Sequence, residues 1–262
     1  MRTKLFNATM LFFSACTAWF SASASHAQSA LTCTAKSAAR VPTVIELYTS
    51  EGCSSCPPAD RWLSQLIKRQ PNPSSDAAPT VALAFHVDYW DYIGWKDAFA
   101  QPAFSKRQSA LARSGGASGV YTPQVFLNGK DDRSWTRGAN PAASVSALAR
   151  ASIAASAQWR DESVAISGKF TSLSTLAGAA RLRYAITENG LVTAVKAGEN
   201  KGETLRHDAV VRAYGELSAD SNGDFSANVR VPKTVRRDAS QLHLIADDAS
   251  GAPMAVATIA CT

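Results

Sequence analysis

The sequence predicts an α/β domain followed by an all-β, β-sandwich-like domain. Strand and helix signals alternate between residues 44 and 157, which is typical of α/β units. Beyond about residue 158, seven short strand-like segments follow one another without helices, as in a small sandwich. We therefore expect a signal peptide at 1–27, an α/β domain at 28–158 and a β-sandwich-like domain at 159–262.

A secretory signal precedes these domains. The first residues are positively charged, residues 5–20 are mostly apolar, and residues 25–27 offer the small side chains that a signal peptidase requires. The apolar stretch is too short and too polar to span a membrane comfortably, so we expect cleavage after Ala27 rather than an uncleaved anchor. The mature protein should then be periplasmic or secreted, with no stable membrane span.

The positive charge of the chain is mild and scattered. The formal net charge is +6 over 262 residues. The densest basic spots are isolated pairs, which fall well short of the basic stripe that nucleic-acid binders present. We interpret this charge as a solvated surface and expect no nucleic-acid partner.

Each element of the first half follows from a local pattern. The apolar runs at 44–49 and 80–87 predict buried strands, and the apolar face of 58–70 predicts a helix that starts at a pair of prolines. A second helix is expected at 95–113, broken or kinked near Pro102.

Three further signals complete the sequence prediction. Residues 124–127 predict a short strand closed by an Asn-Gly turn, and the alanine-rich run 141–157 predicts a helix. A polar stretch at 198–208 is expected to be a solvated hairpin loop; folding back over the cleft of the first domain, or binding a partner, is the alternative. The strands of the second half are expected at 163–170, 181–187, 192–196, 210–214, 225–231, 242–246 and 255–260.

The most informative motif is the pair Cys53 and Cys56, which lies between a predicted strand and the following helix. Unpaired N–H groups and the helix dipole at a helix start favour a thiolate, so such a pair can cycle between dithiol and disulfide. We predict that Cys53 is the exposed nucleophile and that Cys56 is the resolving thiol, one helical step inward.

Three other roles for this pair stay open. It could be half of a zinc site, a copper-handling thiol pair assisted by His86, or a permanently oxidised structural disulfide. The sequence has no second Cys-x-x-Cys and no His-x-x-x-His, so a metal would have to recruit His86 or a distant side chain. We expect no resident metal and no cofactor.

Two further cysteines, Cys33 and Cys261, remain once Cys16 leaves with the signal peptide. An even count in an exported protein makes them natural partners for a structural disulfide. Closing so long a loop would contribute about 4 to 5 kcal/mol in the chain-entropy model. Free thiols, or pairing with another molecule, are the alternative.

Polar residues around the dithiol are candidate supporting groups. His86 and Asp88 emerge at the C-terminal end of a strand, where α/β folds place ligands, and His86 is either a proton shuttle or a hydrogen-bonded strand-end residue. Glu46 interrupts an apolar strand, so it must be paired, exposed at an edge, or protonated where it could relay a proton. Glu51 lies two residues before Cys53.

The strand, the dithiol at a helix start and a later Thr122-Pro123 before 124–129 resemble the thioredoxin superfamily, in which that proline is cis and faces the dithiol. The resemblance implies a thioredoxin-like fold for 28–158. A cis bond would leave the backbone of Thr122 free to pair with an extended peptide, whereas a trans Pro123 would merely start a strand.

A narrower resemblance is to the secreted bacterial family known as domain of unknown function 1223. It rests on residues 46–60, 86–95 and 121–124, and also on 198–200 and 205–208. The similarity spans nearly the whole mature chain, and the family carries no settled substrate.

Together these features predict an exported thiol-disulfide oxidoreductase. Its partners would be protein thiols or disulfides and an unidentified redox partner. A non-catalytic or copper-handling binding protein is the alternative. The direction of electron flow turns on local charge, and the dipeptide between the two cysteines does not settle it.

Overall fold

The computed structural model describes residues 32–69, 80–138, 147–173 and 180–261. The predicted signal peptide and its cleavage site lie outside the described residues. Within the described ranges, no helix is long and apolar enough to cross a membrane.

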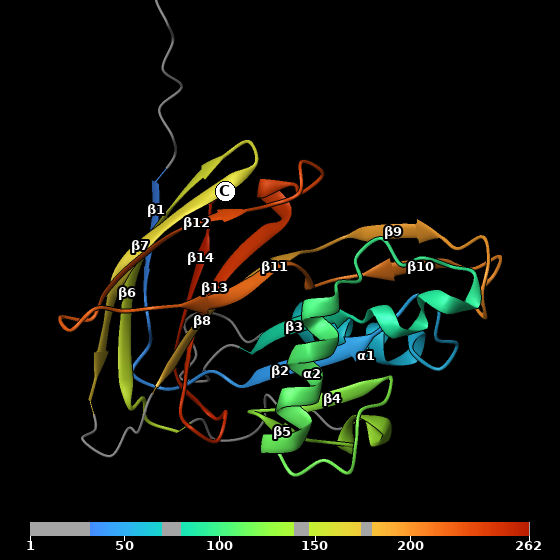
Figure 1. Ribbon diagram of the computed structural model, residues 1–262, viewed down its shortest axis with the longest axis horizontal. Helices are drawn as coiled ribbons and strands as arrows, with labels where there is room; N and C mark the ends of the chain where they lie inside the picture. The colour runs from blue at the N-terminus through green and yellow to red at the C-terminus, as the bar shows by residue number, and fades with distance from the viewer. Residues whose placement is uncertain (1–31, 70–79, 139–146, 174–179, 262) are drawn as a thin grey trace, which may run out of the picture.

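The predicted fold class, a thioredoxin-like α/β domain followed by an all-β domain, is wrong. The described chain is mostly β and contains one sheet whose strands come from both predicted halves. The predicted boundary after residue 158 falls inside a strand. In spatial order the large sheet contains β14 (Pro253–Ala260), β13 (Ser240–Asp247), β8 (Arg181–Glu188), β11 (Val210–Leu217), β3 (Val81–His86), β2 (Val44–Thr49), β4 (Gln124–Leu127) and β5 (Lys130–Asp131) (Figure 1).

The two parts of this sheet join where β11 lies beside β3. Val210 pairs in parallel with Ala84, and the Ala84 N–H donates to the Ala209 carbonyl over 2.8 Å. Without this junction, each part would expose a strand edge with unpaired N–H and C=O groups. Pairing the two edges gives one continuous sheet, which is the physical reason for the departure from the predicted fold.

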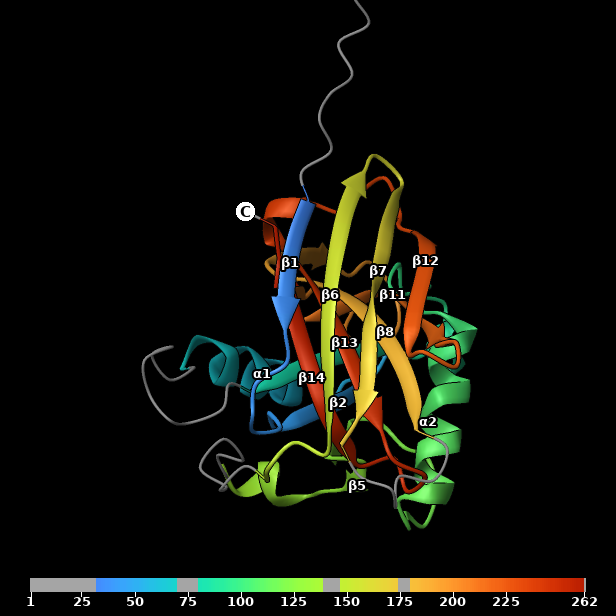
Figure 2. The ribbon, with the colours of Figure 1, turned by 90° about the vertical axis from the view of Figure 1, so that its left-hand side faces the viewer.

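A second, four-stranded sheet packs on the β8–β14 end of the large sheet. It contains β1 (Thr32–Lys36), β6 (Ala151–Arg160), β7 (Ser163–Ser172) and β12 (Asp224–Arg230), which lie side by side in front of β13 and β14 in Figure 2. Apolar residues from both sheets share one buried core. The layers are therefore β-sandwich-like here, and the seven strands predicted for the second half are confirmed.

A disulfide connects the two layers of this sandwich. Cys33 on β1 is bonded to Cys261, which directly follows β14, across a sequence separation of 228. The structure thus joins the two cysteines that the sequence paired by elimination.

Strand β6 corrects the predicted helix at 141–157. Residues 139–146 lie outside the described ranges, and residues 151–160 form a strand in which buried and partly exposed residues alternate. Ile153, Ala157 and Trp159 face the sandwich core. Alanine favours a helix only weakly, and the pairing of β6 with β1 and β7 on either side outweighs that preference.

Two helices cover opposite faces of the strands that carry the dithiol. Helix α1 (Pro57–Lys68) packs on Ile45 and Leu47 of β2, whereas α2 (Pro102–Ser114) packs on the face that carries Tyr48. Burial of both faces explains why β2 is mostly apolar and does not alternate with polar residues, apart from Glu46 and the terminal Thr49.

The second predicted helix is shorter than expected. Residues 95–101 are not helical, and Asp88–Ile93 forms a 3₁₀ helix, η1. Pro102 starts α2 instead of kinking a longer helix, because a proline is tolerated only in the first helical turn.

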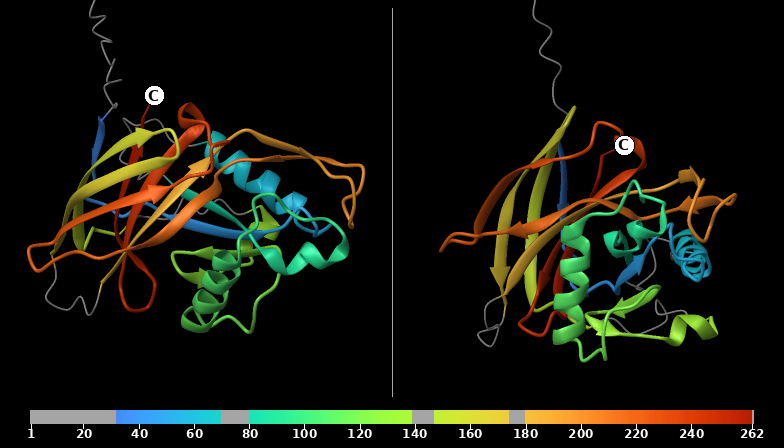
Figure 3. Two further views of the ribbon diagram at one scale, coloured as in Figure 1. Left: turned by 45° about the horizontal axis from the view of Figure 1, so that its top comes forward. Right: turned by 45° about the vertical axis from the view of Figure 1, so that its right-hand side comes forward.

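The polar stretch at 198–208 belongs to a hairpin that folds back over α1. Strands β9 (Leu191–Ala194) and β10 (Thr204–His207) pair with each other, and β10 contacts α1 (Figure 3). The expected hairpin is confirmed and most of its loop is exposed, but Asn200 and His207 are buried because the stretch also folds back over α1, as the alternative had it. This hairpin brings residues from the second half of the chain to the dithiol.

Candidate functional site

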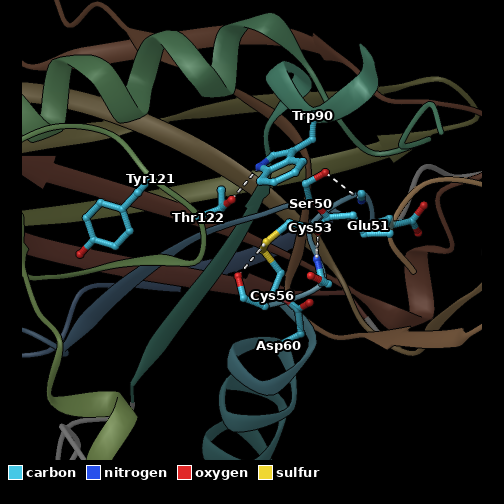
Figure 4. The surroundings of a disulfide bond; sticks show 12 residues. Ser50, Glu51, Cys53, Cys56, Asp60, Trp90, Tyr121 and Thr122 are labelled. Carbon is cyan, nitrogen blue, oxygen red and sulfur yellow. Dashed lines mark hydrogen bonds between the residues drawn. A yellow bond between two sulfur atoms is a disulfide. The ribbon is translucent and has the colours of Figure 1, made fainter. Parts of the chain in front are cut away.

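The dithiol lies in the turn between β2 and α1. The Cys53 N–H donates to the Ser50 carbonyl over 3.2 Å, and the Cys56 N–H donates to the Cys53 carbonyl over 3.1 Å. The Cys56 carbonyl accepts bonds from the first turn of α1, so Cys56 occupies the N-cap position. Cys53 and Cys56 form a disulfide at this helix start (Figure 4).

Both cysteines of this disulfide are fully buried, at 0% exposure each. The expectation of an exposed Cys53 is therefore wrong for the oxidised protein. Ser54 and Ser55 are exposed, and the Ser55 hydroxyl lies 3.3 Å from the Cys53 sulfur. The nucleophile candidate thus lies directly beneath the surface, covered by neighbouring segments.

One cover of the dithiol comes from η1 and the proline segment. The Thr122–Pro123 peptide is cis, and the Trp90 indole donates to the Thr122 hydroxyl over 2.7 Å beside the disulfide (Figure 4). Gly52 permits this close packing, because a Cβ there would lie 3.2 Å from the Trp90 Cβ and 3.1 Å from Ile93.

A second cover comes from the loop between β9 and β10. The Asn200 amide donates to the carbonyls of Glu51 (2.8 Å) and Cys53 (3.0 Å). The Ser54 N–H donates to the Glu199 carboxylate over 3.0 Å. This loop therefore holds the backbone on both sides of Cys53.

A group of buried ionisable side chains lies next to the dithiol loop. We call it the histidine cluster, and it contains Glu51, Asp60, His86, Asp97 and His207. His86 Nδ1 lies 2.6 Å from Asp97 Oδ2, which also accepts the Glu51 N–H over 2.9 Å. His207 Nε2 lies 3.3 Å from Glu51 Oε1, and His207 Nδ1 lies 4.0 Å from Asp60 Oδ2. The two imidazole rings are 5.0 Å apart between centroids.

Burial and mutual attraction shift the pKa values within the histidine cluster. Burial raises the pKa of Asp60, and attraction to His207 and His86 offsets this only in part. For His86, burial lowers the pKa, but Asp97 outweighs it and the net pKa is raised. For Asp97, burial raises the pKa, but His86 outweighs it and the net pKa is lowered. His86 and Asp97 thus stabilise each other in charged form, whereas Asp60 holds its proton more tightly than an exposed aspartate.

The histidine cluster has unused hydrogen-bonding capacity. Within the described part of the chain, four of its buried atoms have no hydrogen-bond partner: Glu51 Oε1, His86 Nε2 and both ring nitrogens of His207. The contact between His207 and Glu51 is therefore close but not aligned as a hydrogen bond. Buried polar atoms are normally satisfied, so an unsatisfied set next to a dithiol indicates a functional arrangement.

Glu51 connects this cluster to the aromatic cover. The Trp95 indole donates to Glu51 Oε2 over 2.8 Å, while the other carboxylate oxygen faces His207. Of the supporting residues that the sequence suggested, Glu51 and His86 lie in the histidine cluster.

Glu46 lies in a different buried group. We call this group the arginine cluster, and it contains Glu46, Tyr48, Arg107, Arg183 and Asp247. Glu46 contacts Arg107 at 2.8 Å and Arg183 at 3.1 Å, and the Tyr48 hydroxyl donates to it over 2.8 Å. Burial raises the pKa of Glu46, but the two arginines outweigh it and lower the value to about 2. Glu46 is thus paired, and it is ionised at neutral pH, so it does not relay protons.

Asp88 does not join the histidine cluster. Its carboxylate accepts a hydrogen bond from the Ser105 hydroxyl, and the Asp88 backbone N–H donates to the oxygen of that hydroxyl over 3.3 Å. Asp88 therefore ties η1 to α2.

The described residues offer no preformed metal site. Among them, no group of three or more His, Cys, Asp or Glu side chains has a geometry that could hold a metal ion.

Sequence reasoning did not single out Asp60, Asp97, Glu199, Asn200 or His207 as individual site residues, although the last three lie in the stretch that could fold back over the cleft. Asp60 had a local signal, because it lies four residues after Cys56 and so one turn along the same face of α1. His207 is separated from Glu51 by more than half the chain, and no local pattern signals that contact.

The comparisons with known proteins provide one family match and two structural matches. The family described as "Protein of unknown function (DUF1223)" matches residues 44–246. A crystal structure of an Agrobacterium tumefaciens protein is 26% identical, with a TM-score of 0.51, and the match covers 84% of this chain and 94% of that one. The structure of HBP35 of Porphyromonas gingivalis is 12% identical, with a TM-score of 0.57 over 85% of this chain and 76% of that one, and shares the fold alone. None of the curated proteins matches this chain.

Proposed function

We propose that this chain, which belongs to the DUF1223 family of proteins of unknown function, is an exported thiol-disulfide oxidoreductase that acts through Cys53 and Cys56. The observation that carries the proposal is the placement of this disulfide at the start of α1, next to a buried carboxyl group of raised pKa. A permanently structural disulfide would need neither the titratable cluster nor the helix start.

The exchange proceeds in two steps. A substrate thiolate attacks the Cys53 sulfur, the bond between Cys53 and Cys56 breaks, and Cys56 leaves as a thiolate. A second substrate thiolate then attacks the mixed disulfide, which releases the oxidised substrate and the Cys53 thiolate. The reverse sequence oxidises Cys53 and Cys56 and reduces a substrate disulfide. Either direction moves two electrons and requires a proton source and acceptor for Cys56.

Asp60 is the proposed proton partner of Cys56. It lies four residues further along α1, on the side of Cys56 away from Trp90 in Figure 4. Its raised pKa brings it closer to neutral pH, where a carboxyl group both donates and accepts protons efficiently. His207 and Glu51 extend this group through close contacts inside the cluster.

The aromatic and proline segments form the wall that a substrate would approach. The local arrangement of dithiol, helix and Thr122-Pro123 is the part in which the chain resembles the thioredoxin superfamily. It supports the same chemistry on a different overall architecture. Access to the Cys53 sulfur requires displacement of the exposed Ser55 side chain or of Trp90.

Single cysteine variants test the function. We expect Cys53→Ser to abolish insulin reduction by dithiothreitol-charged protein, because the attacking sulfur is lost. Cys56→Ser should retain attack but accumulate a mixed disulfide on Cys53, which mass spectrometry detects as a stable glutathione adduct.

The same experiment can reject the proposal. Far-ultraviolet circular dichroism should show that both variants keep the fold, since the loop that this disulfide closes is short. Activity of Cys53→Ser equal to that of the parent protein would contradict the assignment, and so would a stable glutathione adduct on Cys56 of Cys53→Ser with none on Cys53 of Cys56→Ser.

A further inference from the structure

The loop between β9 and β10 places a negative charge beside the dithiol. Gly198 packs on Ile93 and Trp95, Glu199 accepts the Ser54 N–H, and Asn200 holds the Cys53 carbonyl. Three consecutive residues from the second half of the chain thus fix the dithiol loop from outside. Of these, only Glu199 carries a charge.

The Glu199 carboxylate is ionised at neutral pH. Hydrogen bonds from the backbone N–H and the side chain of Ser54 lower its pKa below the ordinary glutamate value. Its carboxylate oxygen lies 3.0 Å from the Ser54 nitrogen. Bond lengths place that nitrogen within about 5 Å of the Cys53 sulfur, so the carboxylate lies inside the Debye length of about 10 Å at 0.1 M salt.

This position opposes a second negative charge on Cys53. A thiolate at a helix start is stabilised by backbone N–H groups and by the positive end of the helix dipole. Glu199 occupies one N–H of the dithiol loop and adds a like charge close to the sulfur. Both effects disfavour the Cys53 thiolate and therefore the reduced form at pH values at which that thiolate would form.

We propose that Glu199 sets the redox equilibrium of the Cys53–Cys56 pair, holding it toward the disulfide by opposing the Cys53 thiolate. The inference rests on the proposed function, since it assumes that this disulfide exchanges. It assigns to the second half of the chain a regulatory role at the site. In glutathione buffer, the balanced reaction converts the protein disulfide and two glutathione thiols into the protein dithiol and one glutathione disulfide.

A variant that changes only Glu199 leaves the other ionisable side chains near Cys53 unchanged. They come from the strand end, from α1, from the segment after η1 and from β10. These groups are Glu51, Cys56, Asp60, His86, Asp97 and His207. A difference confined to a Glu199 variant therefore reports the Glu199 charge.

The test compares Glu199→Gln with the parent protein and with Glu203→Gln as a matched control. Glutamine keeps the size and the hydrogen-bond acceptor but removes the charge. Glu203 is an exposed residue of the same hairpin, four positions further on. Two quantities are measured: the pH profile of Cys53 alkylation in the reduced protein, and the dithiol fraction in glutathione buffers at several pH values.

We expect Glu199→Gln to lower the midpoint of the alkylation profile by about half a pH unit and to raise the dithiol-to-disulfide ratio about three-fold, as for charges near a helix start. The ratio difference should vanish below that midpoint, grow above it, and shrink in 1 M salt because the carboxylate is exposed. Glu203→Gln should match the parent.

Each outcome separates the inference from the function on which it rests. Glu199→Gln equal to the parent, or shifted the opposite way, in a protein that does exchange with glutathione overturns the role of Glu199 alone. Faster alkylation at every pH without a moved midpoint would mean that the residue merely closes the loop, which also overturns the inference. A parent protein whose Cys53 and Cys56 never reduce overturns the proposed function itself.

Discussion

The arginine cluster includes Glu46 and Tyr48 of β2, whereas the histidine cluster lies beyond the end of that strand, and the two differ in the partners of their buried carboxylates. Glu46, in the middle of β2, contacts the guanidinium groups of Arg107 and Arg183, which keep their charge at any pH that proteins tolerate. Glu51, just past the end of β2, instead faces the imidazole of His207, with 3.3 Å between its Oε1 and the His207 Nε2.

The contrast shows how burial can serve either structure or chemistry. Arginine partners hold Glu46 ionised, so the arginine cluster connects β2, β8 and α2 without exchanging protons. The histidine cluster contains imidazole nitrogens without a hydrogen-bond partner among the described residues and a carboxyl group of raised pKa, and it adjoins the dithiol. Only the second arrangement can take up or release a proton when a disulfide opens.

The largest expected effect is on stability and belongs to the arginine cluster. Glu46→Ala leaves buried guanidinium groups without their shared partner, so we expect a loss of about 3 to 5 kcal/mol in the free energy of unfolding. The folded-state pKa of Glu46, about 2, lies below its ordinary value of 4.5, so the ionised carboxylate stabilises the fold above pH 4.5 and this stabilisation is lost as the pH falls toward 2. Urea unfolding from pH 7 to pH 2 should show the difference between variant and parent shrinking.

An exposed ion pair provides the control for Glu46. Glu162 contacts Lys233 at 2.6 Å with both side chains exposed, so Glu162→Ala should change stability little. If Glu46→Ala were as stable as Glu162→Ala, or if it altered the redox equilibrium of the dithiol, the separation between the two clusters would be wrong.

A smaller effect, on rate, is expected in the histidine cluster. Asp60→Asn can neither donate a proton to the leaving Cys56 thiolate nor accept one from the Cys56 thiol, so we expect disulfide exchange at pH 7 to slow by about ten-fold to a hundred-fold. Stopped-flow mixing of the oxidised protein with dithiothreitol measures this rate.

Whereas Glu46→Ala should lower the free energy of unfolding, Asp60→Asn should raise it above pH 3.8. The pKa of Asp60 is raised above its ordinary value of 3.8, so its favourable protonated form is present below pH 3.8 and that contribution is lost as the pH rises through the folded-state pKa. Asp60→Asn should therefore gain stability relative to the parent as the pH rises above 3.8. Asp161→Asn, at an exposed position, is the matched control. Unchanged exchange by Asp60→Asn would remove Asp60 from the proposed mechanism.

Local signals in the sequence predicted much of the fold around the dithiol. The apolar run of β2, the proline pair at the start of α1 and the spacing of Cys53 and Cys56 each carry their information within a few residues. The strand β6 was mistaken for a helix because its alanine content masked an alternation that only its neighbours in the sheet make decisive.

Local sequence patterns did not predict which distant parts of the chain contact each other. The pairing of Val210 with Ala84, which merges the two expected folds into one sheet, has no local pattern. His207 and Glu199 lie in the stretch whose folding back the sequence left only as an alternative, and no local pattern indicated which residues of the site they would contact. For Glu46 the sequence was partly informative. A glutamate in an apolar strand indicated that the side chain needs a partner, but not that the partner is an arginine.

The most direct test of the account measures both disulfides in the same glutathione titration. Differential alkylation followed by mass spectrometry reports the reduced fraction of each cysteine at each redox poise. We predict that Cys53 and Cys56 become reduced together in a two-electron transition while Cys33 and Cys261 stay bonded, because only the first pair adjoins a helix start and a carboxyl group that can donate a proton to the leaving sulfur. A Cys53–Cys56 bond that persists after Cys33 and Cys261 have been reduced would contradict the account.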